Sequence, residues 1–132
     1  MVAAGVREFA RVVDDPEGVF GIAQWFPGSG HEVMLGPAEV VFLKAYADKS
    51  GAAESPDYPA AQAAAGAVLA THCAQIAGGT SRDLLWEAAM RLDTSTLFGG
   101  FKIDPAGAQA KHETVLVRWT DGKPVHFGAA RS

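Results

Sequence analysis

The sequence predicts an α/β protein in which helices pack on a partial sheet and a β-hairpin closes the C-terminal end. Three observations lead to this fold class. Apolar residues recur at helical spacing up to Leu92, alternate with a period of two after it, and Asp121-Gly122 separates two alternating runs. A length of 132 residues suits one domain, and 48% hydrophobic residues can supply a core. We therefore expect residues 1–132 to form a single unit.

Four helices are expected from spacing and end signals, over residues 3–13, 37–50, 58–77 and 82–92. The first ends at Asp14-Asp15-Pro16, and Pro37 suits the first turn of the second helix, which Gly51 ends. Asp57 is a plausible N-cap of the third helix, which Gly78 ends, and Thr80 with Asp83 resembles a capping box for the fourth. The residues expected on the inner faces of the last three helices are Val40, Leu43 and Ala47, then Tyr58, Ala61, Ala65, Leu69, His72 and Ile76, then Leu84, Leu85, Ala88 and Leu92.

Strands are expected over residues 18–24, 97–103, 113–120 and 124–127. The first is a short, continuous apolar run, which is typical of a parallel strand buried on both faces. Residues 113–120 alternate, so that Val115, Val117 and Trp119 share one face. The Asp-Gly pair that follows is the strongest short signal for a hairpin.

Composition and charge exclude several classes of protein. Eleven basic residues against 15 acidic ones give a net charge of −4, and no basic run could follow a phosphate backbone, so nucleic acid is not an expected partner. The single cysteine, Cys73, cannot form an internal disulfide. Arg7, Glu8 and Arg11 interrupt the N-terminal apolar residues, so no signal peptide is recognised and the chain as written would stay in the cytoplasm.

The sequence holds no recognisable catalytic machinery, cofactor motif or metal site. Ser29 lacks the Gly-x-Ser-x-Gly spacing of a nucleophile elbow, and Val33 stands where a dinucleotide fingerprint needs its third glycine. His72 and Cys73 point about 100° apart on a helix, and cannot bind one metal together. The remaining histidines share no ligand spacing and are expected at the surface: His31, His112 and His126. We therefore expect neither an enzyme nor a cofactor.

Residues around the first predicted strand are candidates for ligand binding. Glu17 would place a carboxylate just before the strand, and Gln24-Trp25 would follow its carboxyl end, where ligands bind in open α/β sheets. A carboxylate can pair with a ligand ammonium, Gln donates and accepts hydrogen bonds, and Trp offers a stacking wall. Glu17 as a solvated loop charge and Trp25 as a packing anchor remain the alternatives.

A series of segments in natural order resembles a known family. These segments are residues 15–27, 35–37, 56–62, 85–89, 91–93, 98–105 and 113–123. Together they resemble the C-terminal portion of the leucine/isoleucine/valine-binding proteins, the periplasmic receptors of branched-chain amino acid ABC importers. The resemblance extends from about residue 3 to residue 127 and depends on the whole series, because none of the segments is diagnostic alone.

The resemblance implies a partial periplasmic-binding-protein type I fold and a solute-binding role without catalysis. Such receptors close two α/β lobes on an amino acid or a related amide or carboxylate, and present it to an ABC permease outside the cytoplasm. In this family the acidic residue before the Gly-Val strand can meet the ligand ammonium, which implies that role for Glu17. Gln24 and Trp25 match the segment that leads to the cleft, and Tyr58 matches a position near the hinge.

The chain departs from the family in length. Full members are longer, begin with a signal peptide, and grip the ligand carboxylate with an N-terminal lobe, so we expect a C-terminal fragment that contains pieces of both lobes. Without its neighbours it should expose an apolar patch around Val19, Ile22, Phe42 and Leu69 and tend to self-associate. The alternative is a structural, interaction or sensor domain that has kept pieces of the fold and lost ligand binding.

Overall fold

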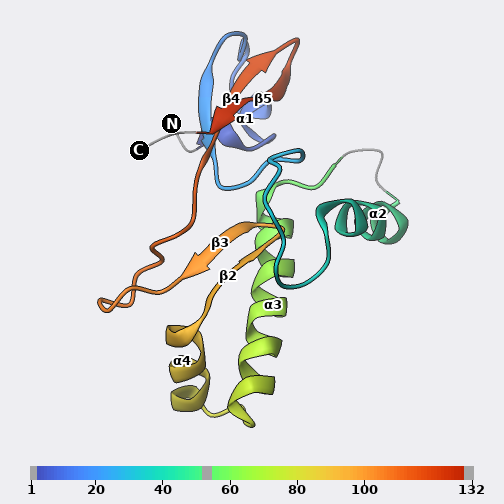
Figure 1. Ribbon diagram of the computed structural model, residues 1–132. Coiled ribbons are helices and arrows are strands. Elements are labelled where there is room, and N and C mark those ends of the chain that lie inside the picture. Colours follow the sequence, from blue (N-terminus) through green and yellow to red (C-terminus); the bar gives the residue numbers. More distant parts are fainter. Residues whose placement is uncertain (1–2, 52–54, 130–132) are drawn as a thin grey trace.

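The computed structural model describes residues 3–51 and 55–129, with the element order shown in Figure 1. The helical elements are η1 (Ala3–Gly5), α1 (Phe9–Val12), α2 (Glu39–Ser50), α3 (Tyr58–Ala77) and α4 (Arg82–Arg91). The strands are β1 (Phe20–Ala23), β2 (Asp93–Thr96), β3 (Gly99–Lys102), β4 (Val115–Thr120) and β5 (Lys123–Ala129).

The first group of elements is a three-stranded antiparallel sheet in the order β1-β4-β5, with η1 and α1 beside it. Antiparallel pairing of β1 corrects the expectation of a parallel strand buried on both faces. Small and large residues alternate along β1. The small residues Gly21 and Ala23 are buried on one face, whereas Phe20 is 46% exposed on the other face. The small residues are needed because the backbone of η1 lies directly against them. A Cβ on Gly21 would stand 2.4 Å from the carbonyl carbon of Ala4.

The buried face of this sheet carries the alternating residues that the sequence predicts. Val115, Val117 and Trp119 are all buried, and the indole Nε1–H of Trp119 donates a hydrogen bond of 2.7 Å to the carbonyl oxygen of Ala4. Phe9 packs on the Trp119 ring at a centroid distance of 5.6 Å. The sequence predicts one helix over residues 3–13, but the structure has the short elements η1 and α1 there. Both contribute a residue to the buried cluster around Trp119.

The predicted C-terminal hairpin is confirmed. β4 and β5 pair antiparallel up to Thr120 and Lys123, so the loop between them is Asp121-Gly122. Both residues have positive φ, 52° and 71°, as a two-residue type I′ turn requires. The sequence pattern therefore gives both the strands and the turn that joins them.

The second group of elements contains α3, α4 and the two-stranded β2–β3 hairpin (Figure 1). The bounds of α3 agree with the prediction, and Gly78 ends this helix with a left-handed φ of 66°. The strand expected over 97–103 is instead β2 and β3, with a turn at Leu97-Phe98. Leu97 is buried beside Trp25 and Ala61, so packing holds a turn whose apolar residues give no turn signal.

Several helix details differ from the predictions. The N-cap of α4 is Ser81 rather than Thr80, and no side chain caps that helix. The N-cap of α2 is Ala38, so Pro37 precedes the helix, and Val40 on its expected inner stripe is 71% exposed. Ile76 and Leu84 are exposed too, whereas Phe42 and Leu43 of α2 pack against the core around Trp25. Helical spacing finds an apolar stripe, but these short, lightly buried helices bury only part of it.

Two segments connect the two groups of elements, namely residues 24–38 and residues 103–114 (Figure 1). We call them the first and the second crossing segment. The first is bound to β2, because the N–H groups of Met34 and Leu35 donate to the carbonyl oxygen of Ser95. The second is bound to β3 through the hydrogen bond from the N–H of Ala110 to the carbonyl oxygen of Lys102, 2.8 Å long. The β2–β3 hairpin is therefore attached to both crossing segments.

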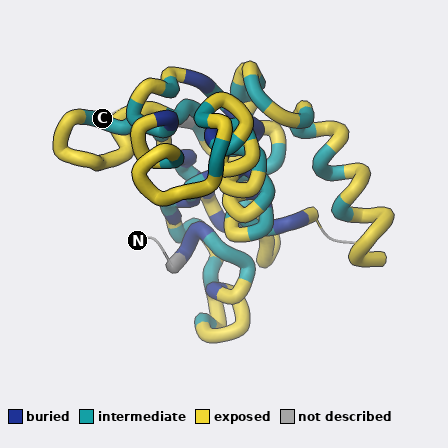
Figure 2. The backbone as a smooth tube through the Cα atoms, turned by 90° about the horizontal axis from the view of Figure 1, so that it is seen from below, coloured by how far each residue is buried: buried dark blue, intermediate teal, exposed yellow. Residues whose placement is uncertain are grey.

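Burial is shallow across the molecule. Figure 2 shows short buried stretches separated by half-buried and exposed ones. The apolar patch expected around Val19, Ile22, Phe42 and Leu69 is not found there, since all of these residues are half-buried. Large exposed apolar side chains occur elsewhere, among them Phe20 and Phe127, whose rings meet edge to face at 5.1 Å on the outer face of the sheet.

Candidate functional site

Glu17 lies at the end of the sheet that is remote from the crossing segments. Its Oε2 accepts a hydrogen bond of 2.8 Å from the N–H of Asp121, so the carboxylate supports the β4–β5 turn. β1 separates Glu17 from Gln24, and its four residues alone span about 13 Å at about 3.3 Å per residue. The structure does not bring Glu17 and Gln24 together.

Trp25 and Tyr58 belong to the core under the second group. Trp25 is 1% exposed, packs with Ala61 and Leu97, and meets Phe42 edge to face at 6.1 Å. Tyr58 is the first residue of α3 and packs on the same cluster while remaining half-buried. In this conformation Trp25 is a packing anchor, and its ring presents no open face to a ligand.

Gln24 lines a pocket of about 410 Å³ where the first crossing segment, α3, the β2–β3 hairpin and the second crossing segment meet. We call it the junction pocket. Its polar lining residues are Gln24, Gln62, Thr96, Gln109 and His112, and its larger apolar ones are Leu69, Phe98 and Phe101. Ligand sites in proteins commonly combine apolar walls with a few polar groups in this way.

The glutamine side chains that line the junction pocket differ in their hydrogen bonding. Gln109 is fully engaged: its Oε1 accepts from the N–H groups of Lys102 and Lys111, and its Nε2 donates to the carbonyl oxygen of Gly100. Gln24 and Gln62 make no side-chain hydrogen bond within residues 3–51 and 55–129. An unengaged carboxamide both donates and accepts, so this pair can meet a carboxylate, an amide or an ammonium group.

His112 forms one wall of the junction pocket. Its ring stacks on Phe98 at a centroid distance of 4.8 Å and an interplanar angle of 12°. Burial lowers the pKa of His112 below its usual value and the neighbouring His31 lowers it further, while a hydrogen bond with the backbone of Gln24 opposes the shift. The sequence analysis expected His112 at the surface. It missed the burial because Phe98 and Gln24, which His112 contacts, are distant from it in the chain.

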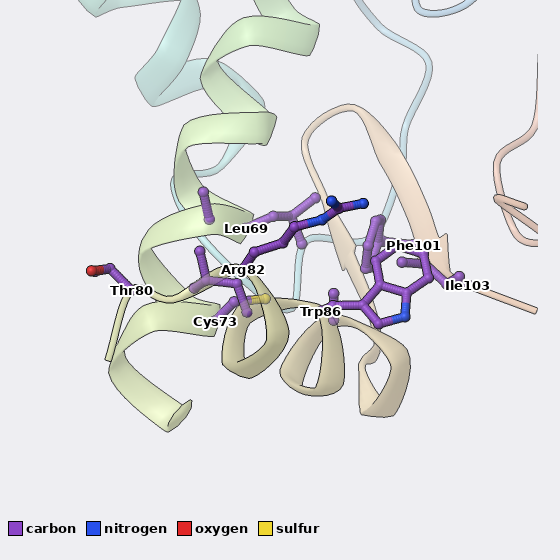
Figure 3. A pocket seen from close by; sticks show the side chains of 10 residues that line it. Leu69, Cys73, Thr80, Arg82, Trp86, Phe101 and Ile103 are labelled. Carbon is purple, nitrogen blue, oxygen red and sulfur yellow. The ribbon is translucent and has the colours of Figure 1, made fainter. Parts of the chain in front are cut away.

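A second pocket, of about 510 Å³, lies between α3, α4 and β3 (Figure 3). Leu69, Cys73, Trp86, Phe101 and Ile103 give it mostly apolar walls. Cys73 is buried, which confirms its interpretation as a small core residue, and burial raises the pKa of its thiol. Because converging polar groups are scarce here, we regard the junction pocket as the candidate site.

Among the residues that the structure describes, no group of three or more His, Cys, Asp or Glu side chains is placed to hold a metal ion. In the same part of the chain, no helix combines the length and apolar character that a membrane crossing needs.

The described chain thus consists of two groups of elements joined by crossing segments, with a polar pocket at the junction. The chain belongs to the periplasmic binding protein family, whose sequence pattern matches residues 10–124. The comparison with curated proteins gives no match. The resemblance found in the sequence and the partial periplasmic-binding-protein fold are thereby confirmed.

Solved structures show the same fold. A leucine binding protein, LivK, from Thermotoga maritima MSB8 has a TM-score of 0.76 and 17% identity over 95% of this chain and 34% of that chain. A periplasmic binding protein from Burkholderia mallei has a TM-score of 0.67 and 13% identity over 87% of this chain and 30% of that chain. An ABC transporter solute binding protein from R. palustris, in complex with benzoate, has a TM-score of 0.63 and 18% identity over 86% of this chain and 30% of that chain. This chain thus spans about a third of the length of each.

Proposed function

We propose that this chain contributes part of the solute-binding site of a receptor for an ABC importer, outside the cytoplasm and without catalysis. The observation that carries the proposal is the junction pocket, where Gln24 and Gln62 offer unengaged amides at the point where both crossing segments meet α3. Membership of a solute-binding family supports it. The expected solute is a small amino acid or a related amide or carboxylate, and the expected protein partner is an ABC permease.

The four residues proposed from the sequence take different parts in this function. Gln24 contacts the solute directly. Trp25 and Tyr58 support the pocket from the core below, through their packing around Ala61. Glu17 stays a candidate for the solute ammonium through its exposed carboxylate, although its contact with Asp121 and its distance from Gln24 favour a separate, structural role in the hairpin.

The expected affinity of the chain by itself is low. The hydrogen bonds that the amides of Gln24 and Gln62 can offer a solute contribute about 0.5–1.5 kcal/mol each. Their sum corresponds to a dissociation constant no better than about 1 mM. A receptor that closes a second surface over the solute gains affinity because it removes water from these contacts.

Calorimetric titration with a panel of amino acids and benzoate tests the proposal. We expect no micromolar binding by the chain alone. Micromolar binding that Glu17→Ala abolishes and Gln24→Ala leaves intact would contradict it, because the site would then lie at the hairpin end of the sheet.

The second candidate is a structural or interaction domain that no longer binds solute. The burial of Trp25 and the engagement of Glu17 by the hairpin favour this alternative. Self-association stays a prediction under either function, and sedimentation velocity at several protein concentrations tests it.

A further inference from the structure

The pocket between α3, α4 and β3 has apolar walls that are partly open to water. Its volume is about 510 Å³, and its larger apolar lining residues are Leu69, Leu85, Trp86, Phe101 and Ile103. Trp86 is 50% exposed and the other four are half-buried. Apolar surface in a concave site favours an apolar ligand, because covering that surface removes it from water.

The second crossing segment holds the Trp86 wall in place. A Cβ on Gly107 would stand 3.5 Å from Cη2 and 3.6 Å from Cζ2 of Trp86, so one edge of the indole lies against the backbone of this segment. Figure 3 shows the ring beside Phe101 and Ile103 of the same pocket. Because this wall is already formed, a ligand would lose little affinity to ordering it.

Arg82 supplies a positive charge to this pocket. Of the described residues that line it, only Arg82 is charged, and Figure 3 shows its side chain extended toward Leu69 and Phe101. Its guanidinium makes no ion pair within residues 3–51 and 55–129. The pocket therefore combines apolar walls with a cation that no lining carboxylate neutralises.

The start of α4 adds positive potential at the same end of the pocket. Arg82 is the first residue of this ten-residue helix, and the N-cap residue Ser81 makes no side-chain cap hydrogen bond. The first N–H groups of a helix carry partial positive charge. Asp83 offsets part of this potential from the first turn, but it is exposed and does not line the pocket.

We propose that this pocket binds a small apolar monocarboxylate, with its hydrocarbon body against Trp86 and Phe101 and its carboxylate at Arg82. Guanidinium groups pair with carboxylates through two parallel N–H···O bonds. Burial of the hydrocarbon supplies most of the affinity, whereas the exposed Arg82 selects the charge of the ligand. The site is separate from the junction pocket, although Leu69 and Phe101 line both.

NMR titration of the full chain with hexanoate and with hexylammonium tests this site, because the two ligands share a tail and differ in charge. We expect hexanoate to shift the indole N–H signal of Trp86, which Trp86→Phe assigns. Trp25 and Trp119 are each 1% exposed and line no part of this pocket, so their signals should stay constant. The dissociation constant should be about fivefold lower for hexanoate than for hexylammonium.

Arg82→Gln should abolish this preference for the carboxylate. The matched control is Arg91→Gln, since Arg91 at the other end of α4 pairs with Glu87 at 3.6 Å and lies outside the pocket lining. Circular dichroism checks that both variants fold. Equal dissociation constants for the two ligands in the wild type, or a preference that Arg82→Gln retains, would overturn the proposal.

The same spectra separate this site from its alternatives. Shifts of the Gln24 and Gln62 amides without a shift of Trp86 would place hexanoate in the junction pocket and overturn the proposal, while leaving the proposed solute site intact. A shift of Trp86 on concentrating the protein without ligand would show that a second copy of the chain occupies the pocket, which would overturn it too.

Discussion

Gly21 should be one of the least replaceable residues in the chain, because η1 lies directly against it. In Gly21→Ala the added methyl group would stand 2.4 Å from the carbonyl carbon and oxygen of Ala4. Unstrained contact between carbon atoms needs about 3.5 Å, so η1 must move away by about 1 Å. That movement breaks the 2.7 Å hydrogen bond from Trp119 to the Ala4 carbonyl.

The magnitude follows from these losses. Overpacking of a tight contact costs about 1–3 kcal/mol, and an unsatisfied buried carbonyl adds about 1–3 kcal/mol, part of which relaxation recovers. We expect Gly21→Ala to lower the free energy of unfolding by about 2–4 kcal/mol. With a typical urea dependence of about 2 kcal/mol per molar, the midpoint falls by on the order of 1 M.

Urea unfolding followed by tryptophan fluorescence and circular dichroism measures this change. The matched control is Gly66→Ala within α3, where an added Cβ meets nothing within 4 Å. Alanine is a better helix former than glycine, so this control should gain about 0.5–1 kcal/mol. A midpoint for Gly21→Ala equal to that of the wild type would refute the described packing of η1 on β1.

Three further predictions follow from single side chains. Trp119→Phe should cost about 1–3 kcal/mol in urea unfolding because the Ala4 carbonyl loses its donor; a cost below the error of the measurement would contradict the role of that hydrogen bond. The lowered pKa of His112 means that the unfolded chain takes up this proton first, so the free energy of unfolding should decrease as the pH falls below about 6.5. His112→Gln should flatten that pH dependence and His126→Gln should not. The raised pKa of Cys73 predicts slow alkylation by iodoacetamide at pH 7.5 until urea unfolds the chain, and equal rates in both states would count against its burial.

Local signals in the sequence account for the elements that were predicted well. Asp57 occupies the N-cap position of α3, but its side chain contacts Arg7 and makes no cap hydrogen bond. The end of α3 follows from Gly78, and the β4–β5 hairpin follows from Asp121-Gly122. In both cases backbone preferences of residues a few positions apart decide the structure, so tertiary contacts are not needed to infer it.

Contacts between distant segments account for the elements that were predicted poorly. The buried turn at Leu97-Phe98 depends on packing against Trp25, and the antiparallel pairing of β1 depends on β4, which lies about a hundred residues later. For the candidate site, the sequence pointed to Gln24 on the pocket wall, but the stacking of His112 on Phe98 beside it exists only in the folded chain.

The central claim is that the solute binds this chain at the junction pocket. NMR spectra of the side-chain amides during titration with leucine and with benzoate, up to tens of millimolar, test it most directly. The claim predicts that the amide signals of Gln24 and Gln62 shift progressively with added ligand, while those of Gln75, near the far end of α3 and outside the residues that line the pocket, stay constant. Unchanged Gln24 and Gln62 signals, together with shifts confined to the indole of Trp86 in the apolar pocket between α3 and α4, would contradict it.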